Sequence, residues 1–132
     1  MDIFKRGKDE SAKYIKKIEE TEGLIIVRLG GALDSSTIPL IKKKLEEMHE
    51  KYAEINAIAD FKKVTHVDTS AIAALVLILS EQAKHGARIG IINAPEELAS
   101  YLKVSKLESA VKIYGSEKAA IKDLAKKDRA EK

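Results

Sequence analysis

Between Leu24 and Leu124, short β-branched apolar runs alternate four times with segments whose apolar residues recur at helical spacing. Strands this apolar, separated by helices, require βαβ crossovers and therefore a mainly parallel sheet. A further strand at 14–21, for which a short helix is the alternative, would pair antiparallel with 24–29 and make the sheet mixed. We therefore expect an α/β domain with a mixed, mostly parallel sheet of four to five strands, packed with about four helices.

Turn and capping signals set the expected bounds of these elements, because Gly, Pro and short polar residues mark the ends of strands and helices. The first long helix has one apolar stripe opposite a Lys/Glu face. The expected strands are 24–29 (closed by Gly30-Gly31), 55–61 (with Asp60 near its end), 87–93 and 110–114, and the expected helices are 38–52 (capped within Asp34 to Ser36, with Pro39 in its first turn), 70–85 (closed by Gly86), one opened by Pro95 and one capped by Gly115-Ser116.

The length of 132 residues is enough for one domain with its own core. We expect a loose leader at 1–12, one domain at 13–126 and a charged tail at 127–132. No stretch near the N-terminus has the apolar length of a signal peptide, and the longest apolar run, Ala71 to Leu79, is far shorter than a bilayer span. The expectation is a soluble, cytoplasmic protein without direct membrane insertion.

Charge and residue types argue against several classes of function. The 24 basic residues are interspersed with 21 acidic ones, whereas nucleic-acid binders concentrate basic charge on one face. The absence of Cys excludes disulfides and thiolate chemistry, and the 3 His residues are not spaced as metal ligands. Glycine-rich phosphate loops and nucleophile elbows are also missing. We therefore expect no enzyme, no cofactor, no metal and no nucleic-acid partner.

One segment stands out, because Val64 to Ser70 leads from a predicted loop into the most apolar helix of the chain. In structural terms, Asp68, Thr69 and Ser70 are N-cap residues that accept hydrogen bonds from backbone N–H groups. In functional terms, a hydroxyl at a helix N-terminus tolerates a phosphate, because N–H groups and the helix dipole favour an anion by roughly 0.3–1 kcal/mol. The two interpretations are compatible.

The segment from Asp68 to Leu75 resembles the Asp-Ser-Ser-Gly-Leu-Gly-x-Leu motif of STAS domains, specifically of bacterial anti-sigma factor antagonists. Other segments resemble the same family in the same order, between about residues 14 and 125, namely 29–34 followed by Pro39-Leu40, 59–64, 93–107 and 113–114. The resemblance implies the α/β fold of a STAS domain.

The resemblance also implies a partner-switching regulator of transcription that is not itself an enzyme. In such families the unphosphorylated antagonist binds an anti-sigma factor with serine kinase activity and so frees a sigma factor. The kinase phosphorylates the second hydroxyl residue of the motif, here Ser70, with Thr69 as the alternative acceptor, and a phosphatase resets the cycle. The ATP belongs to the kinase, so the antagonist needs no catalytic residues.

A contact surface is expected around this motif. Asp34 and Asp60 are included because both lie at the ends of predicted strands, near the same edge of a parallel sheet, although a plain N-cap role is the alternative for Asp34. The predicted partner-binding residues are Asp34, Asp60, Asp68, Thr69, Ser70, Ala71 and Ile72.

Three alternatives stay open. Ala71 and Ala73 stand where the family usually has Gly, which leaves room for a related STAS protein that is never phosphorylated. A STAS subunit of a membrane transport complex, for lipids or anions, is the second alternative. The third is a small α/β ligand-binding protein or enzyme.

Overall fold

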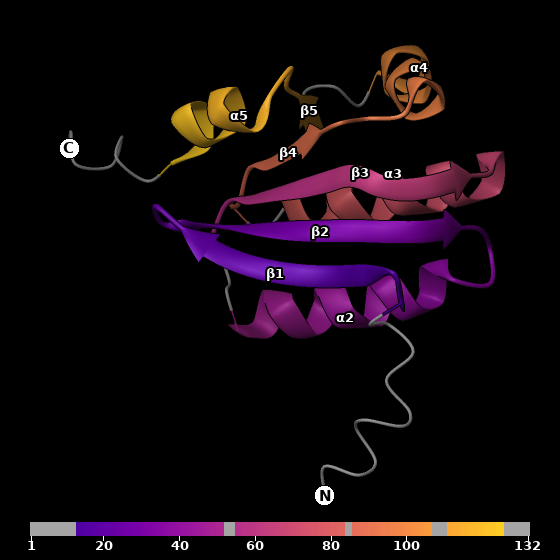
Figure 1. Ribbon diagram of the computed structural model, residues 1–132, viewed down its shortest axis with the longest axis horizontal. Helices are drawn as coiled ribbons and strands as arrows, with labels where there is room; N and C mark the ends of the chain where they lie inside the picture. The colour runs from indigo at the N-terminus through magenta and orange to yellow at the C-terminus, as the bar shows by residue number, and fades with distance from the viewer. Residues whose placement is uncertain (1–12, 52–54, 84–85, 107–110, 126–132) are drawn as a thin grey trace, which may run out of the picture.

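The computed structural model describes residues 13–51, 55–83, 86–106 and 111–125 and contains a five-stranded sheet in the order β1-β2-β3-β4-β5 (Figure 1). β1 pairs antiparallel with β2, and the other neighbouring strands are parallel, so the expected mixed α/β fold is confirmed. The elements are β1 Ile15–Thr21, β2 Leu24–Leu33, α2 Ile38–Lys51, β3 Ala57–Val67, α3 Thr69–Ala83, β4 Ile89–Ile92, α4 Glu96–Ser105, β5 Val111–Ile113 and α5 Glu117–Leu124.

The segment at 14–21 is a strand and not a helix. Its connection to β2 is the two-residue turn Glu22-Gly23, in which both residues have positive φ (48° and 81°). Two positive φ angles in a two-residue loop match the right-handed twist of a hairpin. The sheet therefore starts with an antiparallel edge strand.

β2 and β3 are both longer than predicted. β2 passes through Gly30 and Gly31 to Leu33, and its pairing with β3 shifts register between Arg28 and Gly30 and again after Gly31. Gly31 has φ +78°, and a Cβ on Gly30 would lie 2.7 Å from the Lys16 side chain. The glycines therefore lie inside β2, opposite the places where β3 carries an extra residue, and they do not mark the end of the strand.

β3 continues to Val67, through the segment predicted as a loop. Its residues 62–66 are largely exposed: Val64 packs against the larger core, and the smaller core on the other face does not reach this part of the strand. The prediction of a strand that ends near Asp60 is wrong for this reason. A polar half-exposed strand has the composition of a loop when one face is open to water.

The two faces of the sheet carry separate cores. The larger core lies between one face and α2, α3 and α4, and includes Ile25 and Val27 of β2. The smaller core lies between the other face and α5, and includes Leu24 and Ile26 of the same strand. Successive side chains of a strand point to opposite faces, so the apolar run at the start of β2 serves both cores.

Capping signals near the C-terminus are confirmed. Ser116 is the N-cap of α5, and its Oγ accepts a hydrogen bond of 3.1 Å from Ala119 N–H. In the middle of the chain, Gly86 has φ +92°, the conformation expected of a glycine that closes a helix, while residues 84–85 before it lie outside the described residues. The predicted leader at 1–12 and the predicted tail at 127–132 lie outside the described residues, so the two remain untested predictions.

No helix within the described residues has both the length and the apolar character required to cross a membrane.

Candidate functional site

The C-terminal ends of β2 and β3 lie side by side, on the right in Figure 1, and each turns into a helix there. Leu33 pairs with Val67, and Asp68 N–H donates to Leu33 O at 3.2 Å. The N-termini of α2 and α3 therefore emerge at one edge of the sheet. This edge is the place where ligands and partners of α/β sheets meet the fold most often.

Asp68 is the residue that caps α3. Its Oδ1 accepts a hydrogen bond from Ala71 N–H at 2.9 Å and a second from Ser70 Oγ at 3.0 Å. Thr69 and Ser70 are the first two residues of the helix, and both are exposed. Of the three residues predicted as caps, Asp68 therefore fills the role, and the two hydroxyl residues remain accessible.

Asp34 closes the turn before α2. Its Oδ1 accepts hydrogen bonds from Ser36 N–H at 2.9 Å, Ser36 Oγ at 2.6 Å and Thr37 N–H at 3.2 Å. The bonds from Ser36, and after them the bond from Thr37 and the charge of His66, hold the pKa of Asp34 below its usual range. The capping role is thus present, while the contact with a partner stays a prediction.

Ala71 and Ile72 lie in the larger core. They are 0% and 3% exposed, because the helix turns these two positions toward the sheet. Their side chains are therefore closed off from the surface around Ser70, and a role of these two residues in partner binding stays a prediction. For the same reason the methyl group of Ala71 fills the core and does not stand between Ser70 and an approaching kinase.

Asp60 also lies elsewhere than predicted. It sits within β3, 6% exposed, beside Arg28 of β2 and Ile92 of β4. Its Oδ1 accepts hydrogen bonds from Asn93 Nδ2 at 2.8 Å and from Lys62 N–H at 2.9 Å. Asp60 is thus an internal residue of the sheet and not a strand-end residue at the edge with Asp34 and Asp68.

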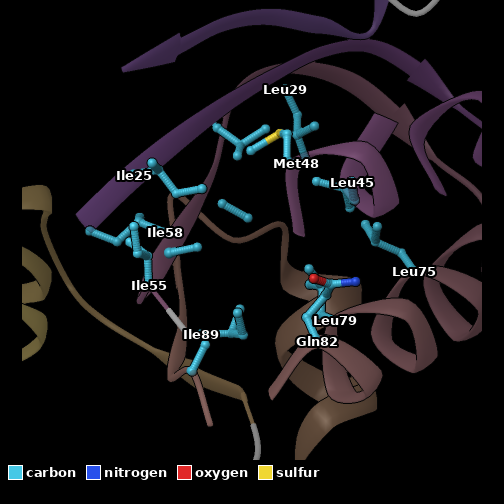
Figure 2. Close-up of a pocket in the computed structure, with 14 residues that line it drawn as sticks. Ile25, Leu29, Leu45, Met48, Ile55, Ile58, Leu75, Leu79, Gln82 and Ile89 are labelled. Atoms are coloured by element: carbon cyan, nitrogen blue, oxygen red, sulfur yellow. The ribbon is translucent and has the colours of Figure 1, made fainter. Parts of the chain in front are cut away.

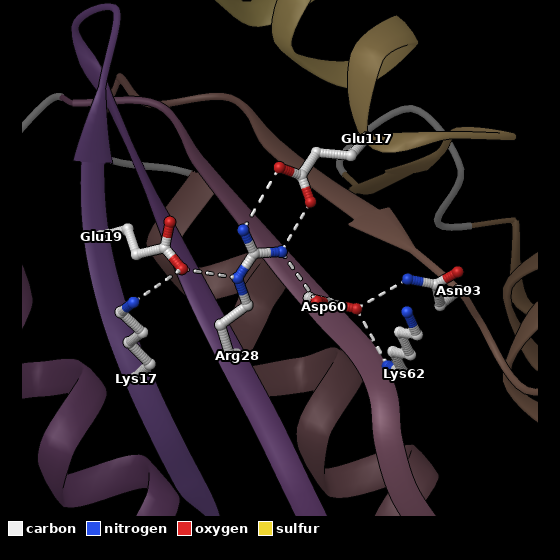
Figure 3. Close-up of polar contacts among 7 residues, drawn as sticks. All are labelled: Lys17, Glu19, Arg28, Asp60, Lys62, Asn93 and Glu117. Carbon is white, nitrogen blue, oxygen red and sulfur yellow. Dashed lines mark hydrogen bonds and ion pairs between the residues drawn. The ribbon is translucent and has the colours of Figure 1, made fainter.

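Arg28 joins Asp60 to two more carboxylates, as Figure 3 shows. Its Nη1 lies 2.8 Å from Asp60 Oδ2 and its Nε 3.0 Å from Glu19 Oε2. Its two terminal nitrogens donate to both oxygens of Glu117, at 2.6 and 3.2 Å. One guanidinium therefore ties β1, β2, β3 and α5 together.

The charges in this cluster stabilise one another. The hydrogen bonds that Arg28 donates to Glu117 and then to Glu19 raise the pKa of Arg28, so it stays charged. Burial raises the pKa of Asp60, but hydrogen bonds from Asn93, Lys62 N–H and Arg28 together outweigh burial and lower it. Sequence analysis missed this cluster. The available signal was a single charged residue in each of two neighbouring apolar strands, Arg28 and Asp60.

An apolar cavity of about 50 Å³ lies in the larger core between the sheet and helices α2 and α3 (Figure 2). Its walls are Ile, Leu, Val, Ala and Met side chains, and Gln82 supplies a polar group. An engineered cavity that binds benzene has about three times this volume. The cavity therefore gives no support to the alternative of a small-molecule binding protein. Among the described residues, no group of three or more His, Cys, Asp or Glu is arranged to hold a metal.

Solved structures with the same fold include regulators and one transporter. An anti-sigma factor antagonist candidate from Thermotoga maritima is 18% identical over 82% of this chain and 92% of its own, with a TM-score of 0.68. The phosphorylated form of the Bacillus cell fate determinant SpoIIAA is 20% identical over 81% of this chain and 96% of its own, with a TM-score of 0.63.

The murine anion transporter Slc26a9 is 20% identical over 70% of this chain, which corresponds to 16% of the transporter, with a TM-score of 0.53. At these identities the likeness shows the fold alone. No curated protein sequence matches this chain. The family model of the STAS domain matches residues 16–120, and the chain therefore belongs to the STAS domain family.

Proposed function

We propose that this chain is an anti-sigma factor antagonist and a phosphorylation-controlled partner switch. Unphosphorylated, it binds an anti-sigma factor with serine kinase activity and frees a sigma factor for transcription. The kinase phosphorylates Ser70, the complex dissociates, and a phosphatase resets the cycle. Membership of the STAS family and the shared fold with SpoIIAA support this proposal. The observation that carries it is the exposed Ser70 hydroxyl at the second position of α3.

The local geometry suits phosphoryl transfer to Ser70. The hydroxyl donates to Asp68 Oδ1 at 3.0 Å, which orients it while the oxygen remains open to solvent. In the transfer, Ser70 Oγ forms the new bond to the γ-phosphorus of ATP, ADP leaves, and the hydroxyl proton is released. All catalytic groups belong to the kinase, so this chain acts as substrate and binding partner.

A phosphate on Ser70 acts on the partner more than on the fold. It adds about −1.5 to −2 charges beside Asp68. The N-terminus of α3 stabilises such an anion by roughly 0.3–1 kcal/mol, so the domain stays folded. A partner surface pressed against the same place must desolvate the charge, and every ~1.4 kcal/mol lost weakens binding tenfold.

Phosphate mapping tests the site. The protein is incubated with the anti-sigma factor kinase of the same cell and ATP, and the product is digested for mass mapping. We expect phosphate on Ser70, none on Ser70→Ala, and unchanged incorporation in the matched control Thr69→Ala. Phosphate on Thr69 alone, or none on the wild type, contradicts the assignment.

Binding measurements test the charge mechanism. Ser70→Glu is expected to keep its thermal unfolding temperature and to bind the anti-sigma factor at least tenfold more weakly, a loss of about 1.4 kcal/mol. Ser100→Glu, at another exposed serine on α4, is the control and is expected to bind normally. Undiminished binding by both Ser70→Glu and the phosphorylated protein would falsify the mechanism.

A second candidate function is a domain that regulates a membrane transporter of lipids or anions. The likeness to Slc26a9 favours it, although the shared part is a small share of that transporter. Affinity purification from the native cell separates the two functions. An ATPase of the histidine-kinase type as the bound protein supports the switch, and a permease complex supports the transporter domain.

A further inference from the structure

A groove of about 940 Å³ runs between α2 and α3. Half of its lining residues are apolar, and one of these is Leu77, which is 62% exposed. In the part of the chain that the structure describes, Leu77 and Val104 of α4 are the large apolar residues left exposed. Val104 stands outside the groove, whereas Leu77 lies in it, so the groove offers apolar surface that a partner can bury.

The groove continues the surface around Ser70. Positions 70, 74, 77 and 81 of α3 follow one another at spacings of 4, 3 and 4 and so share one face of the helix. Ala74 and Leu77 of this face line the groove. At 1.5 Å per residue, Leu77 lies about 10 Å along the helix axis from Ser70. A partner seated in the groove therefore reaches the proposed phosphorylation site.

The groove changes character along its length. Both helices begin at the same edge of the sheet, and the lining residues nearest that edge, Ile38, Pro39 and Ala74, are apolar. The far end carries three carboxylates, while one lysine lies between the two ends. The charged lining residues are Lys42, Glu46, Glu50 and Glu81, so acidic side chains outnumber basic ones in the lining.

We propose that this groove binds an amphipathic helix of the protein partner, with an apolar end toward Ser70 and a Lys/Arg-rich end toward Glu46 and Glu50. The inference rests on the proposed function for the identity of the partner. An elongated apolar groove between helices is a typical site for an amphipathic helix. Complementary charge at the far end fixes the direction in which the helix lies.

The acidic end also selects against other occupants. In a twofold symmetric dimer the groove of one copy lies against the groove of the other, so its carboxylates meet either the carboxylates or the apolar end of the second copy, and neither arrangement gives them a countercharge. Anionic lipid headgroups would be repelled by the same carboxylates. A partner helix with one apolar face and a basic end is the occupant that matches both the apolar lining residues and the carboxylates.

This orientation of the partner helix explains why phosphorylation of Ser70 weakens binding instead of strengthening it. A phosphate on Ser70 adds charge next to the apolar end of the groove, where the partner helix presents apolar residues. It lies far from the basic end, so it gains little attraction from the lysines and arginines. Phosphorylation therefore weakens binding even though the partner helix is positively charged.

Two synthetic peptides test the groove without the kinase. Both form amphipathic helices with the same leucine stripe, and one ends in lysines where the other ends in glutamates. Each is titrated into the ¹⁵N-labelled protein, and amide shifts are followed by NMR. We expect shifts confined to α2 and α3, and binding of the lysine peptide at least tenfold tighter than that of the glutamate peptide.

Variants make the test specific. Leu77→Asp is expected to weaken the lysine peptide at least tenfold, and the matched control Val104→Asp is expected to bind it normally. The double variant Glu46→Lys/Glu50→Lys is expected to prefer the glutamate peptide. Circular dichroism checks that each variant is folded.

Several results overturn the inference. These are equal binding of both peptides, shifts elsewhere than α2 and α3, or unchanged binding by Leu77→Asp. A wild-type dimer in sedimentation that Leu77→Asp converts to a monomer assigns the groove to a second copy instead. Failure here is distinct from failure of the switch: a Leu77→Asp protein that binds the kinase normally and is still released by phosphorylation of Ser70 refutes the groove alone.

Discussion

Replacing Asp60 by Ala removes the carboxylate to which Arg28, Asn93 and Lys62 N–H all donate. The Asp60 side chain is 8% exposed and that of Arg28 21%, so water screens this ion pair little. Loss of one member of a buried ion pair costs about 3–5 kcal/mol, because the remaining charge is left without its partner. Arg28 keeps Glu19 and Glu117, which places the expected loss at the lower end, about 3 kcal/mol.

Urea unfolding measures this loss. Asp60→Ala is expected to lower the urea midpoint with little change in the slope, and to lower the unfolding temperature by roughly 10 °C. Asp60→Asn keeps an acceptor oxygen and the shape of the side chain, so its loss is expected to be about half as large.

The matched control is a surface ion pair. Lys44 and Glu47 lie 3.8 Å apart with side chains 34% and 55% exposed. Glu47→Ala is expected to change stability by less than about 0.5 kcal/mol. A loss in Asp60→Ala as small as that in Glu47→Ala refutes the reasoning, because it means that the Arg28 cluster does not hold the sheet and α5 together.

Three further outcomes follow from the capping residues and the pKa of Asp60. Folding lowers the pKa of Asp60, so the contribution of its carboxylate to stability is complete above the unfolded pKa of about 3.9 and is lost as pH falls from there through the folded pKa. Urea midpoints measured on acidification should therefore converge for wild type and Asp60→Asn. Asp68→Ala removes the acceptor for Ala71 N–H and should cost about 1 kcal/mol in thermal unfolding, whereas Asp68→Asn should cost a few tenths. Ser116→Ala should lower stability by about 1 kcal/mol in the same assay, and an unchanged unfolding temperature would mean that water caps α5 equally well.

The order of strands and helices was predictable from the sequence, because each element has a strong periodic signal. The β2–α2–β3–α3 succession needs only apolar runs, caps and helical spacing, and those features are local. The STAS motif also placed the candidate site at the N-terminus of α3, where Ser70 is exposed. The three hydroxyl and carboxyl groups of that motif could not be told apart by sequence, since any of them can accept a cap hydrogen bond.

The inward and outward faces of α3 were harder to predict than its position. Ala71 and Ile72 belong to the motif and follow Ser70 directly, which suggested a shared surface. A helix rotates by about 100° per residue, so neighbours in sequence lie on different faces. The helix therefore places Ser70 in solvent and the next two side chains in the core.

The Arg28 cluster lies at the border of the sheet face that α5 covers, next to Glu117 at the start of that helix. Over the first half of β2 and β3 both faces are covered, so the sequence is continuously apolar and was recognised as strand. Beyond Asp60 one face is open, and β3 becomes polar, so its second half was mistaken for a loop. At the boundary a side chain is buried on one side and close to water on the other. A charged residue can stay there only with a partner, and in parallel register the nearest position to Asp60 on β2 is that of Arg28. Two isolated opposite charges at paired positions of adjacent apolar strands thus mark the border of the sheet face that a helix covers.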